Sequence, residues 1–161
     1  MGKRADKKRH RNANNASKPT KQPTIGAAPN PLKRPAPTPI ETNGACLVFG
    51  LQFLDSHSPW ALHHADANHI ALIAEKCKSF ESMTPEEVFA THTGNKFCGF
   101  DSFCQEAYDR LHKLELDDYG GLWELRLGGT QRLWGLRSGH IFYVVWWDPE
   151  HLVCPSVLRN T

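Results

Sequence analysis

Residues 119–151, with the sequence YGGLWELRLGGTQRLWGLRSGHIFYVVWWDPEH, have the strongest strand pattern in this chain. The stretch holds four of the five Trp residues and also Arg126, Arg132 and Arg137. Glycine-containing turns at 128–130 and 138–139 divide it into runs in which apolar and polar side chains alternate. Alternating runs separated by short glycine turns predict a three-stranded antiparallel β-meander.

The expected register of this meander separates its side chains onto two faces. A two-residue loop at Ser138-Gly139 pairs Trp134 with Tyr143, and a three-residue loop at 128–130 pairs Arg126 with Arg132. One face is then apolar and carries Leu125, Leu127, Leu133, Phe142, Val144 and Trp146. The other face carries Glu124, Arg126, Arg132, Trp134, Tyr143 and Trp147.

Two arginines lie opposite each other in this register, and like charges directly opposite on one face are unfavourable. One interpretation is structural, because Glu124 is close enough in sequence to bridge Arg126 and Arg132. The other is an anion site, because two guanidinium groups beside Trp and Tyr suit a phosphate backbone with stacked bases. The sequence leaves both interpretations open.

The two ends of the chain differ in charge. Residues 1–43 contain ten Lys and Arg against two acids, with seven of the eleven Pro, whereas residues 44–161 have more acids than bases. A basic segment that is poor in large apolar residues predicts a disordered Pro-rich arm over 1–43 and one domain over 44–161. The arm is either a solubilising tail or a nucleic-acid contact through Lys7, Lys8, Arg9 and Arg11.

Helical patterns precede the meander. Residues 66–80 and 101–116 have apolar side chains at helical spacing, and Thr84, Pro85 and Glu87 form a capping-box pattern. Residues 45–54 predict an N-terminal strand, 95–100 a short strand, and the residues after Pro149 a final one. The predicted fold class is α+β: an N-terminal strand and two or three helices packed on a C-terminal antiparallel meander.

Composition excludes several classes of protein. No stretch is apolar for 18 residues and no apolar region follows the basic N-terminus, so neither a membrane span nor a secretory signal is expected. The odd count of five Cys favours reduced thiols and a cytoplasmic location. The spacing of His92, Cys98, Cys104 and His112 does not match a zinc site, so no metal is expected.

The string LWELR, followed by a glycine turn and then RLWGLRSGHIFYVV, resembles the RelE/HigB-like toxins of toxin–antitoxin systems, and their phage-related branch in particular. The resemblance covers about residues 100–151 in pattern and 45–161 in architecture. In that branch a Lys-Lys segment follows the last long strand. Here the corresponding residues are WWDPEH.

The resemblance implies a metal-independent endoribonuclease without a cofactor that cuts mRNA, often on the ribosome, and that has a cognate antitoxin protein as a partner. It also implies that Arg126 and Arg132 hold the scissile phosphate. We expect His151 or Tyr143 to transfer protons, and Trp134 and Trp147 to contact the RNA. The alternative is a non-catalytic module of the same fold that binds a protein or nucleic acid through the Arg and aromatic face.

Overall fold

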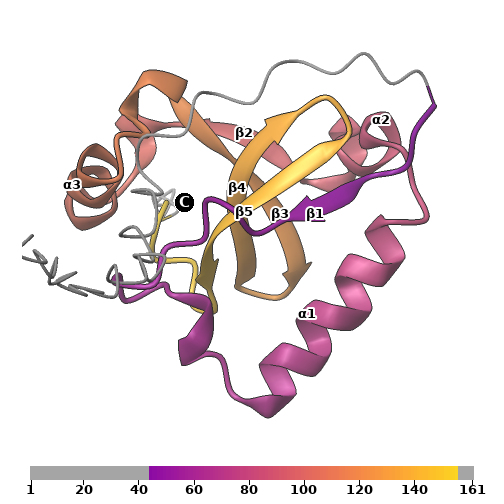
Figure 1. The fold of residues 1–161 in the computed structure, drawn as a ribbon, viewed down its shortest axis with the longest axis horizontal. Coiled ribbons are helices and arrows are strands. Elements are labelled where there is room, and N and C mark those ends of the chain that lie inside the picture. Colours follow the sequence, from indigo (N-terminus) through magenta and orange to yellow (C-terminus); the bar gives the residue numbers. More distant parts are fainter. Residues whose placement is uncertain (1–43, 156–161) are drawn as a thin grey trace, which may run out of the picture.

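The computed structural model describes residues 44–155, and the predicted arm with Lys7, Lys8, Arg9 and Arg11 lies outside them. Within the described residues, three α-helices and a five-stranded sheet form a mixed α+β fold (Figure 1). The predicted α+β class is therefore confirmed.

The sheet has the order β1-β5-β4-β3-β2. Its centre is the antiparallel meander of β3 (Gly121–Gly128), β4 (Gln131–Ser138) and β5 (Ile141–Asp148). Strand β2 (Lys96–Gly99) adds to β3 in antiparallel direction, and β1 (Val48–Gly50) adds to β5 in parallel direction. Strand β1 is shorter than the 45–54 predicted. Residues 149–155 contain no strand, and the remainder of the predicted final strand lies outside the described residues.

Local capping explains where two of the helices begin. The Asp66 side chain accepts a hydrogen bond from His69 N–H at 2.8 Å, which caps α1 (Ala67–Phe80). Thr84 and Glu87 form both hydrogen bonds of a capping box before α2 (Pro85–Val88), as predicted. Helix α3 (Gln105–Lys113) is shorter than the 101–116 predicted, because residues Phe100–Ser102 form a separate 3-10 turn.

Both faces of the sheet are covered, and Figure 1 shows α3 and α1 on opposite sides of it. The core under α3 contains Trp60, Ala107, Leu111, Leu122, Trp134, Leu136, Tyr143, Val145 and Trp146. The core under α1 and α2 contains Leu47, Ile73, Val88, Leu125, Leu127, Leu133, Phe142, Val144 and Trp147. A sheet with apolar layers on both sides explains the near-continuous apolar run of β5.

The predicted register of the second hairpin is wrong. Ser138 pairs with Ile141, so the loop is Gly139-His140, and Trp134 pairs with Trp146 rather than Tyr143. The register shifts between Trp134 and Gly135, where β5 carries an extra residue. This bulge reverses the predicted faces of the tandem tryptophans, because Trp146 joins the α3 side and Trp147 the α1 side.

Glycine is required at the bulge. A Cβ atom on Gly135 would lie 2.3 Å from the Tyr143 carbonyl oxygen and 2.7 Å from the Phe142 ring. Only a residue without a side chain lets β4 approach β5 this closely.

Candidate functional site: a buried carboxylate among four donors

A buried ion pair joins β3 to β4. Arg132 Nε lies 2.5 Å from Glu124 Oε1, and the two side chains are 5% and 3% exposed. The same guanidinium donates through Nη1 to the carbonyl oxygens of Gly129 at 2.8 Å and Gln131 at 2.9 Å. The predicted pairing of Arg126 with Arg132 is confirmed. The structural interpretation, in which Glu124 neutralises the arginines, holds for Arg132.

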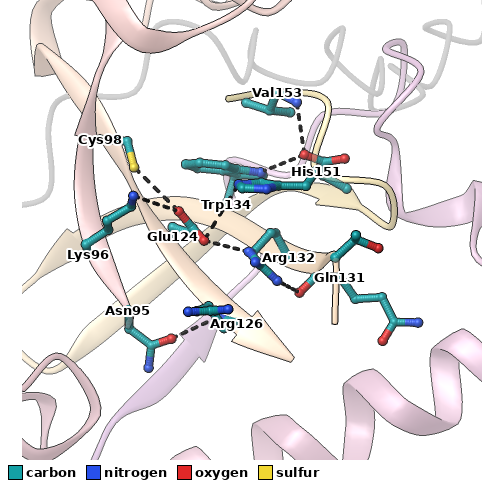
Figure 2. A network of polar contacts seen from close by, with 12 residues as sticks. Asn95, Lys96, Cys98, Glu124, Arg126, Gln131, Arg132, Trp134, His151 and Val153 are labelled. Atoms are coloured by element: carbon teal, nitrogen blue, oxygen red, sulfur yellow. Dashed lines mark hydrogen bonds and ion pairs between the residues drawn. The ribbon is translucent and has the colours of Figure 1, made fainter. Parts of the chain in front are cut away.

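Three further donor groups surround the Glu124 carboxylate (Figure 2). The Cys98 thiol donates to Oε2 at 3.6 Å, and Lys96 Nζ lies 4.0 Å from the same oxygen. His151 Nε2 lies 3.9 Å from Oε1. Strand β2 contributes Lys96 and Cys98 because Lys96 pairs with Glu124 in the sheet. We call Lys96, Cys98, Glu124, Arg132 and His151 the Glu124 cluster.

The turn after β5 holds His151 in this cluster. The Asp148 carboxylate is fully buried and accepts hydrogen bonds from Trp134 Nε1 at 3.2 Å, Leu152 N–H at 2.9 Å and Val153 N–H at 3.0 Å. His151 itself has a φ of 61°, in the left-handed region. Its Nε2 is buried without a hydrogen-bond partner in the described part of the chain. The turn therefore places beside Glu124 a ring nitrogen that can still form a hydrogen bond.

Arg126 differs from Arg132 in its surroundings. Its side chain is exposed, and no carboxylate among residues 44–155 forms an ion pair with it. Its backbone N–H donates to Asn95 Oδ1 at 2.8 Å, and its guanidinium lies over Gly94, where a Cβ would approach Nη1 to 2.6 Å. A cation held in this way next to the Glu124 cluster is available to an anion from solution.

The aromatic residues predicted for the site are buried. Trp134, Trp147 and Tyr143 are 0%, 2% and 8% exposed. Trp147 packs against the His69 ring at 5.4 Å, and Tyr143 packs edge-on against Phe53 at 5.4 Å. Trp134 and Tyr143 belong to the core under α3 and Trp147 to the core under α1 and α2, so base stacking on Trp134 or Trp147 would require them to be uncovered.

The Cys98 thiol is a poor nucleophile in this setting. Burial raises its pKa to about 12, and the negative charge of Glu124 acts in the same direction. A thiol that stays protonated at neutral pH reacts slowly as a nucleophile, because the thiolate is the reactive form. Among residues 44–155, no group of three or more His, Cys, Asp or Glu side chains is arranged to hold a metal ion.

A second buried ion pair lies on the α3 side of the sheet. Arg110 of α3 donates through Nε and Nη2 to Asp55 at 2.8 and 2.5 Å, and Trp146 Nε1 donates to the same carboxylate at 2.9 Å. Burial acts to raise the pKa of Asp55, but these hydrogen bonds outweigh it and lower the pKa to about 2. The pair ties α3 and the segment before α1 to β5, so we assign it to the fold.

Sequence reasoning reached part of the site. It identified Arg126, Arg132 and His151, and the structure brings Arg132 and His151 to the same carboxylate oxygen, Oε1 of Glu124. It treated Glu124 only as a bridge, and it missed Lys96 and Asp148. The alternation in LWELR did place Glu124 on the face of Arg132, and that was the available signal.

No helix in the described ranges is long and apolar enough to cross a membrane.

Comparison with known proteins adds no family assignment, because no family model, no curated protein and no solved structure matches this chain.

Proposed function

We propose that this protein is a toxin-like, metal-independent endoribonuclease that cuts mRNA in the cytoplasm. The observation that carries the proposal is the Glu124 carboxylate, whose Oε1 lies 2.5 Å from Arg132 Nε and 3.9 Å from His151 Nε2. Arg126, which has no ion-pair partner among residues 44–155, lies opposite Arg132 in the sheet. In RNA cleavage without a metal, a carboxylate can act as general base, an imidazole as general acid, and guanidinium groups can stabilise the charge on the phosphoryl oxygens. The resemblance to RelE/HigB-like toxins points the same way.

The reaction would use the ribose 2′-hydroxyl as the nucleophile. Glu124 accepts the proton of this hydroxyl, and the 2′-oxygen forms a bond to phosphorus. The bond from phosphorus to the 5′-oxygen breaks, and protonated His151 gives its Nε2 proton to that oxygen. The products are a 2′,3′-cyclic phosphate and a 5′-hydroxyl. Arg132 and Arg126 stabilise the charge that develops on the phosphoryl oxygens.

Access to the carboxylate requires a movement of the turn at 149–153. Glu124 is 3% exposed, and His151 Nε2 lies only 3.9 Å from it, which leaves no space for a phosphate between them. The exposed cations Lys96 and Arg126 attract the RNA first. The phosphate then takes its place between the imidazole and the carboxylate, and a cognate antitoxin would act by preventing this step.

The test combines cleavage in vitro with growth in cells. The purified full-length protein is incubated with a single-stranded RNA and with the same RNA carrying a 2′-deoxyribose at the cleavage position. We expect cleavage of the first only, with a cyclic phosphate end. Arg126→Ala and His151→Ala should lower the rate at least about 100-fold, whereas the exposed Lys113→Ala on α3 should not. Growth arrest on expression should follow the same order.

An alternative function is a non-catalytic binding module of the same fold. The observation that favours it is burial, since Glu124 and Arg132 satisfy each other and Trp134, Tyr143 and Trp147 are in the core. Folded protein that binds RNA or a protein partner, leaves RNA intact and gives no growth arrest would establish this alternative in place of the ribonuclease.

A further inference from the structure

An aromatic ladder with an arginine lies across the sheet from the Glu124 cluster. The Phe97 and Trp123 ring centroids are 5.6 Å apart, and those of Trp123 and Phe89 are 4.7 Å apart, both edge-to-face. The Arg137 guanidinium carbon lies 5.2 Å from the Phe89 ring centroid and 5.3 Å from that of Trp123. We call these four residues the Phe97 ladder. The mechanism proposed above uses none of them.

The outer end of the ladder is open to solvent. Phe97 is 48% exposed, and it belongs to β2, which is the edge strand next to β3 in the sheet formed by residues 44–155. The Arg137 side chain is 23% exposed, and its ion-pair partner is Glu86 at 3.5 Å, which is itself 76% exposed. Such a surface ion pair contributes little stability, so Arg137 can exchange Glu86 for a phosphate at small cost.

The ladder and the Glu124 cluster meet at the β2 edge. Lys96 and Phe97 are consecutive residues of one strand, so their side chains point to opposite faces of the sheet. Lys96 reaches toward Glu124, with Nζ 4.0 Å from Oε2, and Phe97 reaches toward Trp123. A nucleic-acid strand that passes over this edge therefore contacts both.

We infer that the Phe97 ladder is a second RNA subsite, where one base of the single strand next to the cleaved phosphate stacks on Phe97 and Arg137 contacts its phosphate. This inference rests on the proposed function, because it names where the substrate of that site continues. Stacking on an exposed ring beside arginine binds single strands with little sequence preference, since every base has a π-face. The cations Lys96, Arg126 and Arg137 favour a polyanion over an apolar protein surface.

The test uses an RNA analogue that cannot be cleaved. A single-stranded 2′-O-methyl oligonucleotide is titrated into the full-length protein, and tryptophan fluorescence reports binding. We expect quenching, because the stacked base lies beside Phe97 and Trp123. Phe97→Leu keeps an apolar side chain without the ring and should weaken binding about ten-fold. Phe97→Tyr should bind as the wild type does, and Trp123→Phe should bind with much less quenching.

Tyr108→Leu is the matched control, since Tyr108 is another aromatic side chain with similar exposure, 44%, and lies on α3, outside the ladder and the Glu124 cluster. Its affinity should equal that of the wild type. Equal affinity of Phe97→Leu and wild type, or no binding by the wild type, would overturn the inference. The inference would also be overturned if Phe97→Leu bound the oligonucleotide as the wild type does but had a different mass in sedimentation, because the surface would then be an interface between protein chains.

The two proposals fail separately in this design. The analogue lacks the 2′-hydroxyl nucleophile, so its binding does not depend on catalysis. Ten-fold weaker binding by Phe97→Leu in a protein that never cleaves natural RNA would support the subsite and overturn the ribonuclease. Cleavage that depends on His151, with binding that is independent of Phe97, would do the reverse.

Discussion

Glu124 and Arg132 form an ion pair that is almost completely withdrawn from water, with 2.5 Å between Arg132 Nε and Glu124 Oε1 and side chains that are 3% and 5% exposed. Removing two charges from water costs several kcal/mol for each ion, and the attraction between them roughly offsets that cost. The pair therefore stabilises the fold only while both partners are present.

Replacing Glu124 by Gln should destabilise the domain. The substitution keeps the shape of the side chain but leaves Arg132 as a buried charge without a counterion, which costs about 3 kcal/mol. Urea denaturation followed by tryptophan fluorescence measures the loss. A double variant, Glu124→Gln with Arg132→Met, should recover part of it, because the uncompensated charge is gone.

Glu86→Gln is the control for this experiment, because Glu86 forms an exposed ion pair with Arg137. Its free energy of unfolding should change by less than about 0.5 kcal/mol. Equal losses for Glu86→Gln and Glu124→Gln would contradict the buried-pair argument.

Alanine substitutions of Arg126 and Arg132 should differ in their effect on stability, although both should lower RNA cleavage. Arg126 is exposed and unpaired in the described structure, so Arg126→Ala should leave the free energy of unfolding within about 0.5 kcal/mol of the wild type. It should nevertheless lower RNA cleavage strongly. Arg132→Ala removes the closest partner of the buried Glu124 charge and should lower the melting temperature as well. Parallel melting curves and cleavage rates check both, and a melting temperature that fell as far for Arg126→Ala would argue against this division.

Asp55 should make the domain acid-sensitive. Its pKa in the folded protein is about 2, below the ordinary value of 3.8, because Arg110 and Trp146 donate to the ionised carboxylate. A lowered folded-state pKa stabilises the fold above about pH 4, and this stabilisation is lost as the pH falls from there toward 2. The loss is about 2 kcal/mol.

Denaturation curves between pH 5 and pH 2 measure the effect. Asp55→Asn should be less stable at neutral pH but should lack this part of the acid-dependent loss. Asp118→Asn, at an exposed position, should follow the wild type throughout. An identical pH dependence of Asp55→Asn and wild type would show that another group causes the acid sensitivity.

Cysteine reactivity should follow burial. Cys46 is exposed, whereas burial raises the pKa of Cys98 to about 12. Because alkylation requires the thiolate, iodoacetamide at pH 8 should modify Cys46 quickly and Cys98 only after denaturation. Peptide mass spectrometry at several times distinguishes the two sites. Rapid labelling of Cys98 in the folded protein would mean that the Glu124 cluster opens often.

Local signals in the sequence predicted local structure well. The Thr84 capping box and the helix after Asp66 depend on residues three or four positions apart, and both are present. The bulge beside Gly135 was not predicted, although a glycine inside a strand pattern is a local sign of a bulge. Which strand carries the extra residue depends on how β4 packs against β5. That single extra residue moved Trp146 and Trp147 to the faces opposite to those expected.

The site was predictable to the extent that it lies within one hairpin. Glu124, Arg126 and Arg132 share β3 and β4, so alternation placed them on one face. Lys96 comes from β2, whose pairing with β3 has no turn signal because α3 lies between the two strands. Asp148 binds the turn after β5 through backbone N–H groups, which the sequence does not reveal.

The parallel pairing of β1 with β5 has a consequence for synthesis of the chain. Val48 and Ile141 are partners, so the first strand is made long before its neighbour exists. Contacts so distant in sequence form late in folding. Until β1 docks, the outer edge of β5 offers unpaired backbone groups next to a strongly apolar strand, which is a template for aggregation. Once docked, the three residues of β1 cover this edge of β5 and prevent it from pairing with a strand of another newly made copy.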